Sequence, residues 1–325
     1  MNQKMLVMAV ILIIAIPLLN DNFLNSASAQ GIQFPSRPIK FLLGAGVSDV
    51  MDLTYRPLCK AAAKTLGQPI VVQNTPGAGG NRAMSAILNE KPDGYTLVGV
   101  PSGVILAARA EKLDYSIPND FTPVIQVENI AIPYAVRKDA PYRTWQEFIN
   151  YTREHKGQVK VAVWGPVSLP WLALRNVEKK ENVTFVYIPY SSTGEMMSSI
   201  LGGHTVLTAG AGAIVYVKSG ELNALLLLSE QRAKTLPNVP TTKELYGLYG
   251  MCFSGGLPGI FAPKGLPQPI LKKLHDAFKK AMEDPEYQKT ADKLEVLPSY
   301  KSPEEFAKII KALDEESKEA LMGMK

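Results

Sequence analysis

The stretch Ile70-Val-Val-Gln-Asn-Thr-Pro-Gly-Ala-Gly-Gly-Asn81 decides the fold class, because it joins a short β-rich run to a glycine-rich turn. The same order recurs at Ile39–Leu43 with the turn Gly44–Asp49, and at Tyr95–Val100 with the turn Pro101–Gly103. Each turn leads toward an amphipathic stretch. Short strands that alternate with amphipathic helices are typical of parallel sheets covered by helices. The pattern therefore predicts an α/β protein whose turns lie at the carboxyl ends of the strands.

A second series of β-rich runs follows the extended segment Ile130–Arg137. Its members are Gln158–Trp164, Phe185–Ile188, Val206–Leu207 and Leu222–Leu228. A single hydrophobic core stops growing near ~250–300 residues. Because the chain has 325 residues, we expect two lobes, each a mainly parallel sheet flanked by helices.

The C-terminal part of the chain is expected to be helical. Five apolar residues fall on one face of a first helix: Ile270, Leu271, Leu274, Phe278 and Met282. Ser302, Pro303 and Glu305 supply an N-cap, a proline at the first position and a capping-box glutamate for a second helix. We expect these helices to close a lobe rather than to bind a partner.

Composition and charge exclude several classes of protein. Hydrophobic residues make up 46% and charged residues 20% of the chain, far from the extremes of a disordered chain or a membrane bundle. The net charge of +5 is spread along the chain, and its longest clusters are pairs such as Lys272-Lys273. We therefore expect no nucleic-acid partner.

The cysteines and histidines are too few and too scattered for a metal site. Two Cys and three His occur without CxxC or HxxxH spacing, which predicts no metal. His155, His204 and His275 are expected at the surface. In an oxidising compartment Cys59 and Cys252 either form a disulfide or remain two buried thiols.

The turn Gly44-Ala-Gly46 imitates a dinucleotide-binding fingerprint, because it follows a strand and precedes a helix. However, Asp49 stands at the third-glycine position, and Gln73 and Asn74 follow the second strand in place of an acidic residue. The sequence also has no P-loop, G-x-S-x-G elbow or HExxH motif. We expect no cofactor and no catalytic residues.

The N-terminus has the features of a signal peptide. The apolar run Met5–Leu19 follows Lys4 and precedes the small-x-small sequence Ala27-Ser-Ala29. The run is shorter than the ~20 residues that span a bilayer, which disfavours the alternative of a membrane anchor. We expect residues 1–29 to be removed, Gln30 to begin the mature chain, and the protein to be periplasmic.

Several motifs together resemble the periplasmic substrate-binding proteins of tripartite tricarboxylate transporters, the Bug family. The most specific are the stretches Leu66–Asn81 and Lys91–Leu97. Further matches in order and spacing are Phe34–Ile39, Phe121–Val124, Leu201–Gly203, Leu236–Thr241, Phe261–Gly265 and Ser302–Phe306. The resemblance covers essentially the whole mature chain.

The resemblance implies a two-lobed, type II periplasmic-binding-protein fold that closes on a small molecule. On this basis residues 30–131 plus 254–325 form lobe 1, and residues 132–253 form lobe 2. The chain is expected to cross between the lobes near Ile130–Ile132 and Met251–Gly255, where closure would hinge.

Ligand contact is expected at the turns, because helix N-termini present free backbone N–H groups and a positive dipole end. A carboxylate is then captured without a charged side chain. Within lobe 1 the expected ligand-binding residues are Ser48, Asp49, Asp52, Ala78, Gly79, Gly80 and Ser102. Within lobe 2 the resemblance implies Trp164, Gly165, Ser168, Tyr190, Thr193 and Ala209, which stand at the positions of the family's ligand loops.

The first turn departs from the family pattern, which carries a Phe and several Gly before a Thr-Asp pair. This chain has Ala45, Ser48, Asp49, Val50 and Met51 there, although Asp52 and Arg56 are kept. A desolvated Asp49 would repel an anion. Either its side chain turns outward, or the ligand carries a donor or a cation at that point.

A second departure concerns aromatic residues in lobe 2. Trp171 stands where the family often has His. With Trp164 and Tyr190 it would form an aromatic wall that favours a planar aromatic or amide-bearing ligand over a short dicarboxylate. The alternative is that Trp171 packs in the core.

We therefore predict an exported, monomeric solute-binding protein that takes a small organic acid or related molecule to a tripartite tricarboxylate-type transporter. Its partners would be that small molecule and a membrane permease. One alternative is a ligand-loaded periplasmic sensor that docks on a receptor ectodomain. Another is an enzyme on the same scaffold that uses Asp49 or Asp52 as a base, which the lack of a paired acid, nucleophile or metal disfavours.

Overall fold

The first sheet of the protein has six strands and carries the glycine-rich turns of the opening motif. The computed structural model describes residues 34–248 and 256–322. The strands are β1 (Ile39–Leu43), β2 (Ile70–Asn74), β3 (Thr96–Val100), β4 (Phe121–Ile130), β10 (Gly259–Pro263) and β11 (Val296–Lys301). Their order is β11-β4-β10-β3-β1-β2. The central β1 is parallel to β2 and β3, whereas β10 is antiparallel to β3 and β4. The expected parallel arrangement is confirmed for the first three strands, but the sheet as a whole is mixed rather than mainly parallel, because β10 and β11 pair antiparallel.

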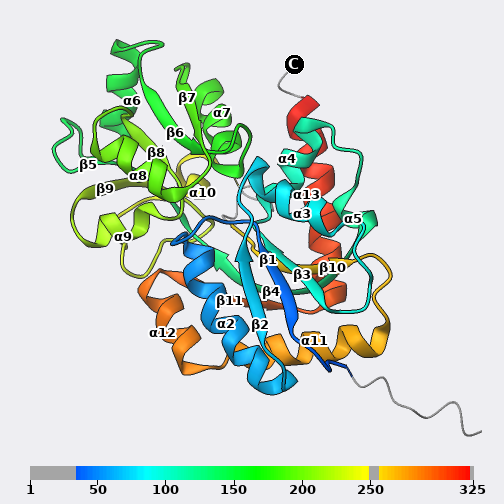
Figure 1. Ribbon diagram of the computed structural model, residues 1–325. Helices are drawn as coiled ribbons and strands as arrows, with labels where there is room; N and C mark the ends of the chain where they lie inside the picture. Colours follow the sequence, from blue (N-terminus) through cyan, green and yellow to red (C-terminus); the bar gives the residue numbers. More distant parts are fainter. Residues whose placement is uncertain (1–33, 249–255, 323–325) are drawn as a thin grey trace, which may run out of the picture. The chain divides into compact units, whose positions relative to one another are not determined.

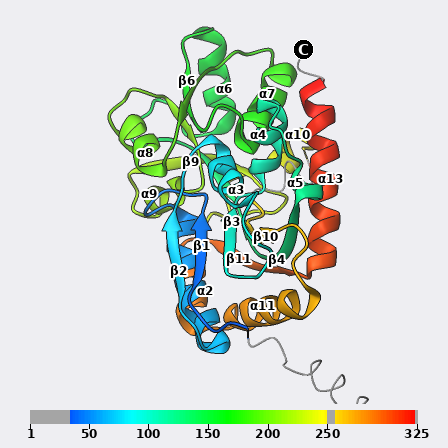
Figure 2. The ribbon, with the colours of Figure 1, turned by 45° about the vertical axis from the view of Figure 1, so that its right-hand side comes forward.

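Helices cover this first sheet. They are α2 (Val50–Leu66), α3 (Asn81–Ile87), α4 (Gly103–Glu111), α5 (Ile117–Asp120), α11 (Gln268–Ala281), α12 (Pro285–Lys293) and α13 (Pro303–Met322), with the 3-10 turn η1 (Ala78–Gly80). Helix α2 packs against α11 and α12, and α13 packs along α4 and β4. Figure 2 shows α13 lying beside α4 and α5.

The two predicted C-terminal helices are confirmed. The five apolar residues assigned to one face of α11 are all buried. Helix α13 begins with the expected reciprocal cap, in which the Ser302 amide donates to Glu305 at 2.9 Å and the Glu305 amide donates to the Ser302 hydroxyl at 3.2 Å. Phe306 and Ile310 turn into the core. Both helices thus cover the first sheet, as their amphipathic patterns indicate.

The second sheet has five strands in the order β7-β6-β8-β5-β9. They are β5 (Ile132–Arg137), β6 (Lys160–Trp164), β7 (Val186–Tyr190), β8 (Leu207–Ala209) and β9 (Leu222–Leu228). Its helices are α6 (Trp145–Glu154), α7 (Leu169–Glu181), α8 (Thr193–Leu201), α9 (Ala213–Lys218) and α10 (Thr242–Tyr246). The inner strand β6 is parallel to β7 and β8, and β5 is antiparallel to both of its neighbours. Figure 1 shows the two groups of strands as separate layers.

The chain passes from the first sheet to the second at Ala131, between β4 and β5. This step lies within the expected crossing Ile130–Ile132. The second expected crossing, Met251–Gly255, lies outside the described residues, so the exact lobe boundaries stay a prediction. Residues 37–325 form one compact unit, and residues 1–36 form a separate one, of which 34–36 are described and contain no helix or strand.

Several smaller expectations about single residues have mixed outcomes. His204 is exposed, but His155 and His275 are half-buried, so their assignment as surface residues was wrong. His155 stacks on Tyr151, and His275 contacts the Tyr300 hydroxyl at 3.0 Å. Cys59 is a buried free thiol in α2, whereas Cys252 lies outside the described residues. In the described ranges no helix is both long and apolar enough to cross a membrane.

A buried carboxyl group ties α2 to the first sheet. Glu128 on β4 has no solvent exposure. The Thr54 hydroxyl donates to one of its oxygens at 3.2 Å, and the Tyr287 hydroxyl donates to the other at 3.4 Å. Burial raises the pKa of Glu128 to about 8, although these hydrogen bonds oppose the rise. The folded protein therefore holds a proton on Glu128 at neutral pH.

This raised pKa predicts that stability falls as pH rises. The unfolded chain releases the Glu128 proton near the ordinary glutamate pKa, so its stabilising contribution is complete below that value and is lost as pH rises through about 8. Between pH 5 and pH 8 the free energy of unfolding should fall by about 3 kcal/mol more in the wild type than in Glu128→Gln. Urea unfolding at several pH values measures this difference, and parallel curves for the two proteins would contradict it.

Candidate functional site

A cavity of about 120 Å³ lies between the turns of the two sheets. The turns that follow β1, β2 and β3 line it from the first sheet, and those that follow β6, β7 and β8 line it from the second. A water molecule needs roughly 10–15 Å³ of such volume, so the cavity has room for a small molecule. This position at the carboxyl ends of strands is where α/β sheets bind ligands.

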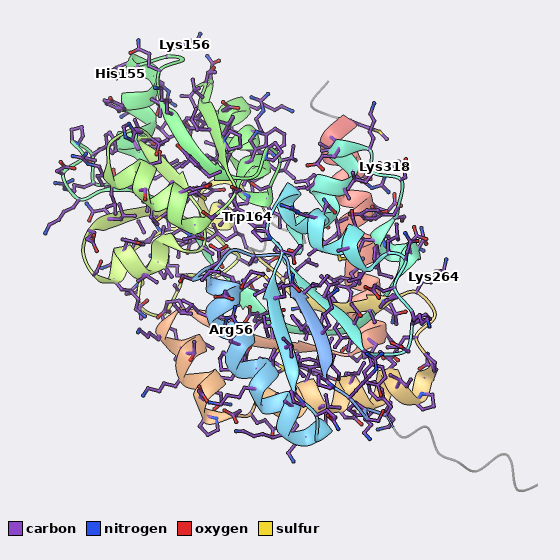
Figure 3. All side chains as sticks on the ribbon, in the orientation of Figure 1. Arg56, His155, Lys156, Trp164, Lys264 and Lys318 are labelled. Atoms are coloured by element: carbon purple, nitrogen blue, oxygen red, sulfur yellow. The ribbon has the colours of Figure 1, made fainter. Side chains whose placement is uncertain are left out.

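The walls of this cavity are mostly apolar. The apolar lining residues are Ala45, Val50, Met51, Pro101, Ile130, Ile132, Trp164, Val167, Leu169, Pro170, Met196, Ala209, Ala211 and Pro258. Figure 3 shows Trp164 between the two groups of strands. Among the described lining residues there is no Lys, Arg or His. A bound molecule would therefore be surrounded by hydrocarbon, with polar contact at a few points only.

The first polar point is Ser168, at the N-terminus of α7. Ser168 is the N-cap residue of this helix, yet its side chain accepts no hydrogen bond from the first turn. Its hydroxyl is buried and has no partner among the described residues, and the residue is 5% exposed. Since a buried hydroxyl without a partner is unfavourable by ~1–3 kcal/mol, its position in the cavity wall indicates a place for a ligand atom.

The helix behind Ser168 adds a positive pole. The first amides of any helix lack intrahelical acceptors and carry the positive end of the macrodipole. In α7 the Leu172 amide already bonds the Ser168 carbonyl at 2.9 Å. Pro170 has no N–H, which leaves the amides of Leu169 and Trp171 as first-turn donors without an acceptor among the described residues. An acceptor that carries negative charge is the group that this end of the cavity suits.

Ser102, in the turn after β3, differs from Ser168 although both are buried and line the cavity. Its hydroxyl accepts a hydrogen bond from the Leu257 amide at 3.1 Å. That bond fastens the turn after β3 to the segment that precedes β10. Ser102 therefore has a structural partner that Ser168 lacks.

The second polar point is Asp49, which is 5% exposed. One carboxylate oxygen accepts from the Gly46 amide at 2.5 Å, and the other accepts from the Thr193 amide at 2.9 Å. Thr193 is the first residue of α8 in the second sheet's layer. Burial raises the pKa of Asp49, and the hydrogen bonds from Thr193 and Gly46 oppose that rise. The Asp49 side chain thus spans the cavity's edge from one layer to the other.

The structure brings seven of the expected ligand residues into the cavity wall. They are Asp49, Gly79, Ser102, Trp164, Ser168, Thr193 and Ala209. Three others, Ala78, Gly165 and Tyr190, line a neighbouring hollow of about 260 Å³, the outer hollow. It shares Gly79 and Trp164 with the cavity.

Three expected ligand residues lie outside both hollows. Ser48 is exposed, and its amide donates to Asp52 at 3.0 Å. The Asp52 carboxylate also accepts from Arg56 at 2.9 Å and from Asn74 at 2.8 Å. Burial opposes ionisation of Asp52, but these hydrogen bonds lower its pKa. Asp52 therefore holds the turn together and does not face a ligand.

Gly80 is the third residue outside the hollows. A Cβ placed there would face Pro101 at 3.3 Å, and Val100 and Val104 beyond it, so Gly80 packs on its own layer. Gly79 differs, because its Cβ position lies 2.8 Å from the Ala107 Cβ and 4.0 Å from the Val167 carbonyl across the cavity. Both glycines have positive φ angles. A side chain at either position would therefore strain the turn.

Of the three residues predicted to form an aromatic wall, only Trp164 lines the cavity. Tyr190 lines the outer hollow instead, and its hydroxyl donates to Ser199 at 2.7 Å. Trp171 packs edge-on against Tyr187 and does not line the cavity. Trp171 is thus a packing residue, the alternative that the sequence left open.

Sequence reasoning did not single out several lining residues. Ile130, Ile132, Val167 and Met196 belong to this group. Each resembles an ordinary core residue in sequence, and no local signal separates the two roles. Within the described ranges no three His, Cys, Asp or Glu side chains come together in a way that could hold a metal ion.

Comparison with known proteins supports the resemblance found in the sequence. The family described as "Tripartite tricarboxylate transporter family receptor" matches residues 54–322. A protein of Cupriavidus necator, the UPF0065 protein in the gbd 5' region, is 35% identical over 86% of this chain and 85% of its own length.

Solved structures match the fold. The periplasmic binding protein BugD is 25% identical, with a TM-score of 0.81 over 89% of this chain and 98% of BugD. MatC from Rhodopseudomonas palustris, solved with bound malate, is 27% identical, with a TM-score of 0.80 over 88% of this chain and 99% of MatC.

These matches confirm the predicted two-lobed α/β fold and the predicted family. The family consists of periplasmic receptors that bind small molecules and work with tripartite transporters; its members are not enzymes. Because the family match covers most of the sequence, this chain belongs to the tripartite tricarboxylate transporter receptor family.

Proposed function

We propose that the protein is an exported receptor that captures a small organic acid in the cavity between its lobes and delivers it to a tripartite tricarboxylate-type transporter. The observation that carries this proposal is the Ser168 hydroxyl, which is buried in the cavity wall and has no partner in the part of the chain that the structure describes. It stands at the N-terminus of α7, where free amides favour a negatively charged acceptor. MatC, a relative of the same fold, holds malate.

The chemistry of the cavity supports binding rather than catalysis. Asp49 already accepts two backbone hydrogen bonds, and Asp52 is bound to Arg56 and Asn74 outside the cavity. A general base needs reach to a substrate proton and an acid partner. Neither carboxylate meets that need, so the enzyme alternative has no support from these residues.

A ligand-loaded sensor would use the same cavity, and growth of a transporter-deletion strain on the ligand would distinguish it from a transport receptor.

The ligand can be identified directly. We expect protein purified without refolding to retain a small molecule in its cavity, because closed lobes exclude water and strengthen each polar contact. Native mass spectrometry would give the mass of that molecule, and fragmentation would show whether it is an acid. A retained molecule without any acidic group would contradict the proposal.

Export is the second part of the proposal. Residues 1–29 have the apolar run and small-x-small sequence of a signal peptide, and members of the family are periplasmic. We expect N-terminal sequencing of the periplasmic protein to begin at Gln30. A mature protein that still contains residues 1–29 would contradict this assignment.

Two serine variants should separate ligand binding from stability. Ser168→Ala removes a hydroxyl that has no protein partner, so the melting temperature of the ligand-free protein should not fall. Affinity for the identified acid should fall by about tenfold or more, which corresponds to loss of one hydrogen bond to a charged group. Calorimetry at pH 7.5 measures this change.

Ser102→Ala is the matched control for that experiment. It deprives the Leu257 amide of its acceptor, so the free energy of unfolding should fall by ~1–3 kcal/mol. If Ser168→Ala binds the acid as tightly as the wild type does, the acceptor position at α7 is wrong.

A further inference from the structure

The N-termini of several helices line the cavity, among them those of α2, α4, α7 and α8, and the last two differ in how their donors are used. At α7 the Ser168 hydroxyl has no partner among the described residues. At α8 the amide of the first residue, Thr193, donates to Asp49. The two ends are chemically alike, since both carry free amides and a positive dipole. One is thus open to a ligand, while a side chain of the protein occupies the other.

Several other donors at the start of α8 also have partners within the protein. The Glu195 amide donates to the Ser192 hydroxyl at 3.3 Å. The Ser191 amide and hydroxyl each donate to the Glu195 carboxylate at 3.0 Å. With the Thr193 amide bound to Asp49, this end of the cavity has few donors left for a second acidic group.

The turn after β1 holds Asp49 in this position. Its second oxygen accepts from the Gly46 amide at 2.5 Å. A Cβ at position 46 would lie 2.9 Å from that same oxygen, so glycine is needed for the close approach. Behind it, Asp52 binds the Ser48 amide and Arg56. The backbone thus presents the Asp49 carboxylate to α8 in a prepared conformation.

The charge of Asp49 has no cationic partner at the cavity. Arg56 is the nearest cation in its network, and it pairs with Asp52. The described lining residues include no Lys or Arg. A ligand carboxylate at this end would therefore meet a like charge inside a mostly apolar cavity, where repulsion is poorly screened.

We propose that Asp49 occupies the α8 end of the cavity in place of a ligand carboxylate, so that the receptor selects an acid with a single carboxylate and an apolar body. The carboxylate binds at Ser168 and the first turn of α7, and the body lies against Trp164, Met196 and their apolar neighbours. This inference rests on the proposed function, because it assumes that the cavity binds an acid. It narrows the ligand class to monocarboxylates.

The same contact joins the two lobes. The Asp49–Thr193 hydrogen bond links the turn after β1 to the first residue of α8, positions 144 residues apart. Both groups of this contact belong to the protein itself. Its effect on how the lobes are held together can therefore be measured without knowing the ligand.

The first test compares acids that differ only in a second carboxylate. Pentanoate with glutarate, and benzoate with terephthalate, are suitable pairs for calorimetry at pH 7.5, together with the acid retained on purification. We expect the wild type to bind the monocarboxylate of at least one pair at least tenfold more tightly. Asp49→Asn removes the charge but keeps an acceptor, whereas Asp49→Gly removes both. The preference for the monocarboxylate should be smaller in Asp49→Asn than in the wild type. In Asp49→Gly it should be smaller by about tenfold or more.

Glu195→Gln is the matched control. It removes one negative charge from the same helix end, but Glu195 is exposed and lines the outer hollow. We expect its preference between paired acids to equal that of the wild type.

The second test is small-angle scattering of the ligand-free proteins. Asp49→Gly should have a larger radius of gyration than the wild type and Glu195→Gln.

The outcomes separate this inference from the proposed function. If no acid binds and none is retained on purification, the proposed function is wrong. The inference that the ligand is a monocarboxylate is then wrong as well. If acids bind but the wild type prefers the dicarboxylate, or Asp49→Gly leaves the preference unchanged, only the role of Asp49 is wrong. An unchanged radius of gyration would exclude the link between the lobes. Should a variant fail to fold, the wild-type preference and the carboxylate count of the retained acid still decide the ligand class.

Discussion

The first amides of a helix have no acceptor within the helix, and the site of this protein depends on how the chain meets that constraint. Some helix starts are closed locally: α6 and α10 have complete capping boxes at Thr144 and Thr241. At the cavity, the Thr193 amide at the start of α8 donates to Asp49 of the other lobe. The start of α7 lies beside Ser168, whose hydroxyl has no partner among the described residues. This buried hydroxyl is thus where an external acceptor is favoured.

The precision of this arrangement depends on a network behind the turn after β1. Asp52 collects hydrogen bonds from the Ser48 amide, Arg56 and Asn74. Two residues further along α2, the Thr54 hydroxyl donates to the buried Glu128 on β4. The start of helix α2 is therefore attached through polar contacts to both β2 and β4. Such attachment fixes the direction in which Asp49 points, and a shift of α2 would break the Thr193 contact.

Much of the fold could be predicted from the sequence because its strands are local apolar runs that end in turn residues. Strands β1, β2 and β3 were expected on this ground, and their turns line the cavity. Strand β4 was not predicted, apart from its last residue Ile130, because Pro123, Gln126 and Glu128 interrupt its apolar pattern. Those polar groups find partners only in the folded chain, as Gln126 does at Ser299 and Glu128 at Thr54.

The candidate site was less predictable, because its chemistry depends on contacts between distant segments. Ser168 and Gly79 could be proposed because their turns match the family's ligand loops. The role of Asp49 could not, since its partner Thr193 lies in another layer and no local pattern links the two positions. The sequence left open whether Asp49 turns outward or meets a donor on the ligand. The structure gives a third answer, in which the donor is the protein's own backbone.

Recognition by neutral donors has a physical reason in a cavity of this kind. A lysine or arginine at the position of Ser168 would be buried without a partner whenever the cavity is empty, and an unpaired buried charge is unfavourable by several kcal/mol. A hydroxyl at the same place is unfavourable by ~1–3 kcal/mol, and helix amides keep their dipole whether or not a ligand is bound. The ligand-free receptor can therefore remain folded around an apolar cavity. Asp49 is also paired with neutral donors, although here the charge belongs to the protein. Its buried charge is tolerated only because the Gly46 and Thr193 amides donate to it. A charge held in this way can discriminate between ligands at one end of the cavity while the other end supplies the binding contact.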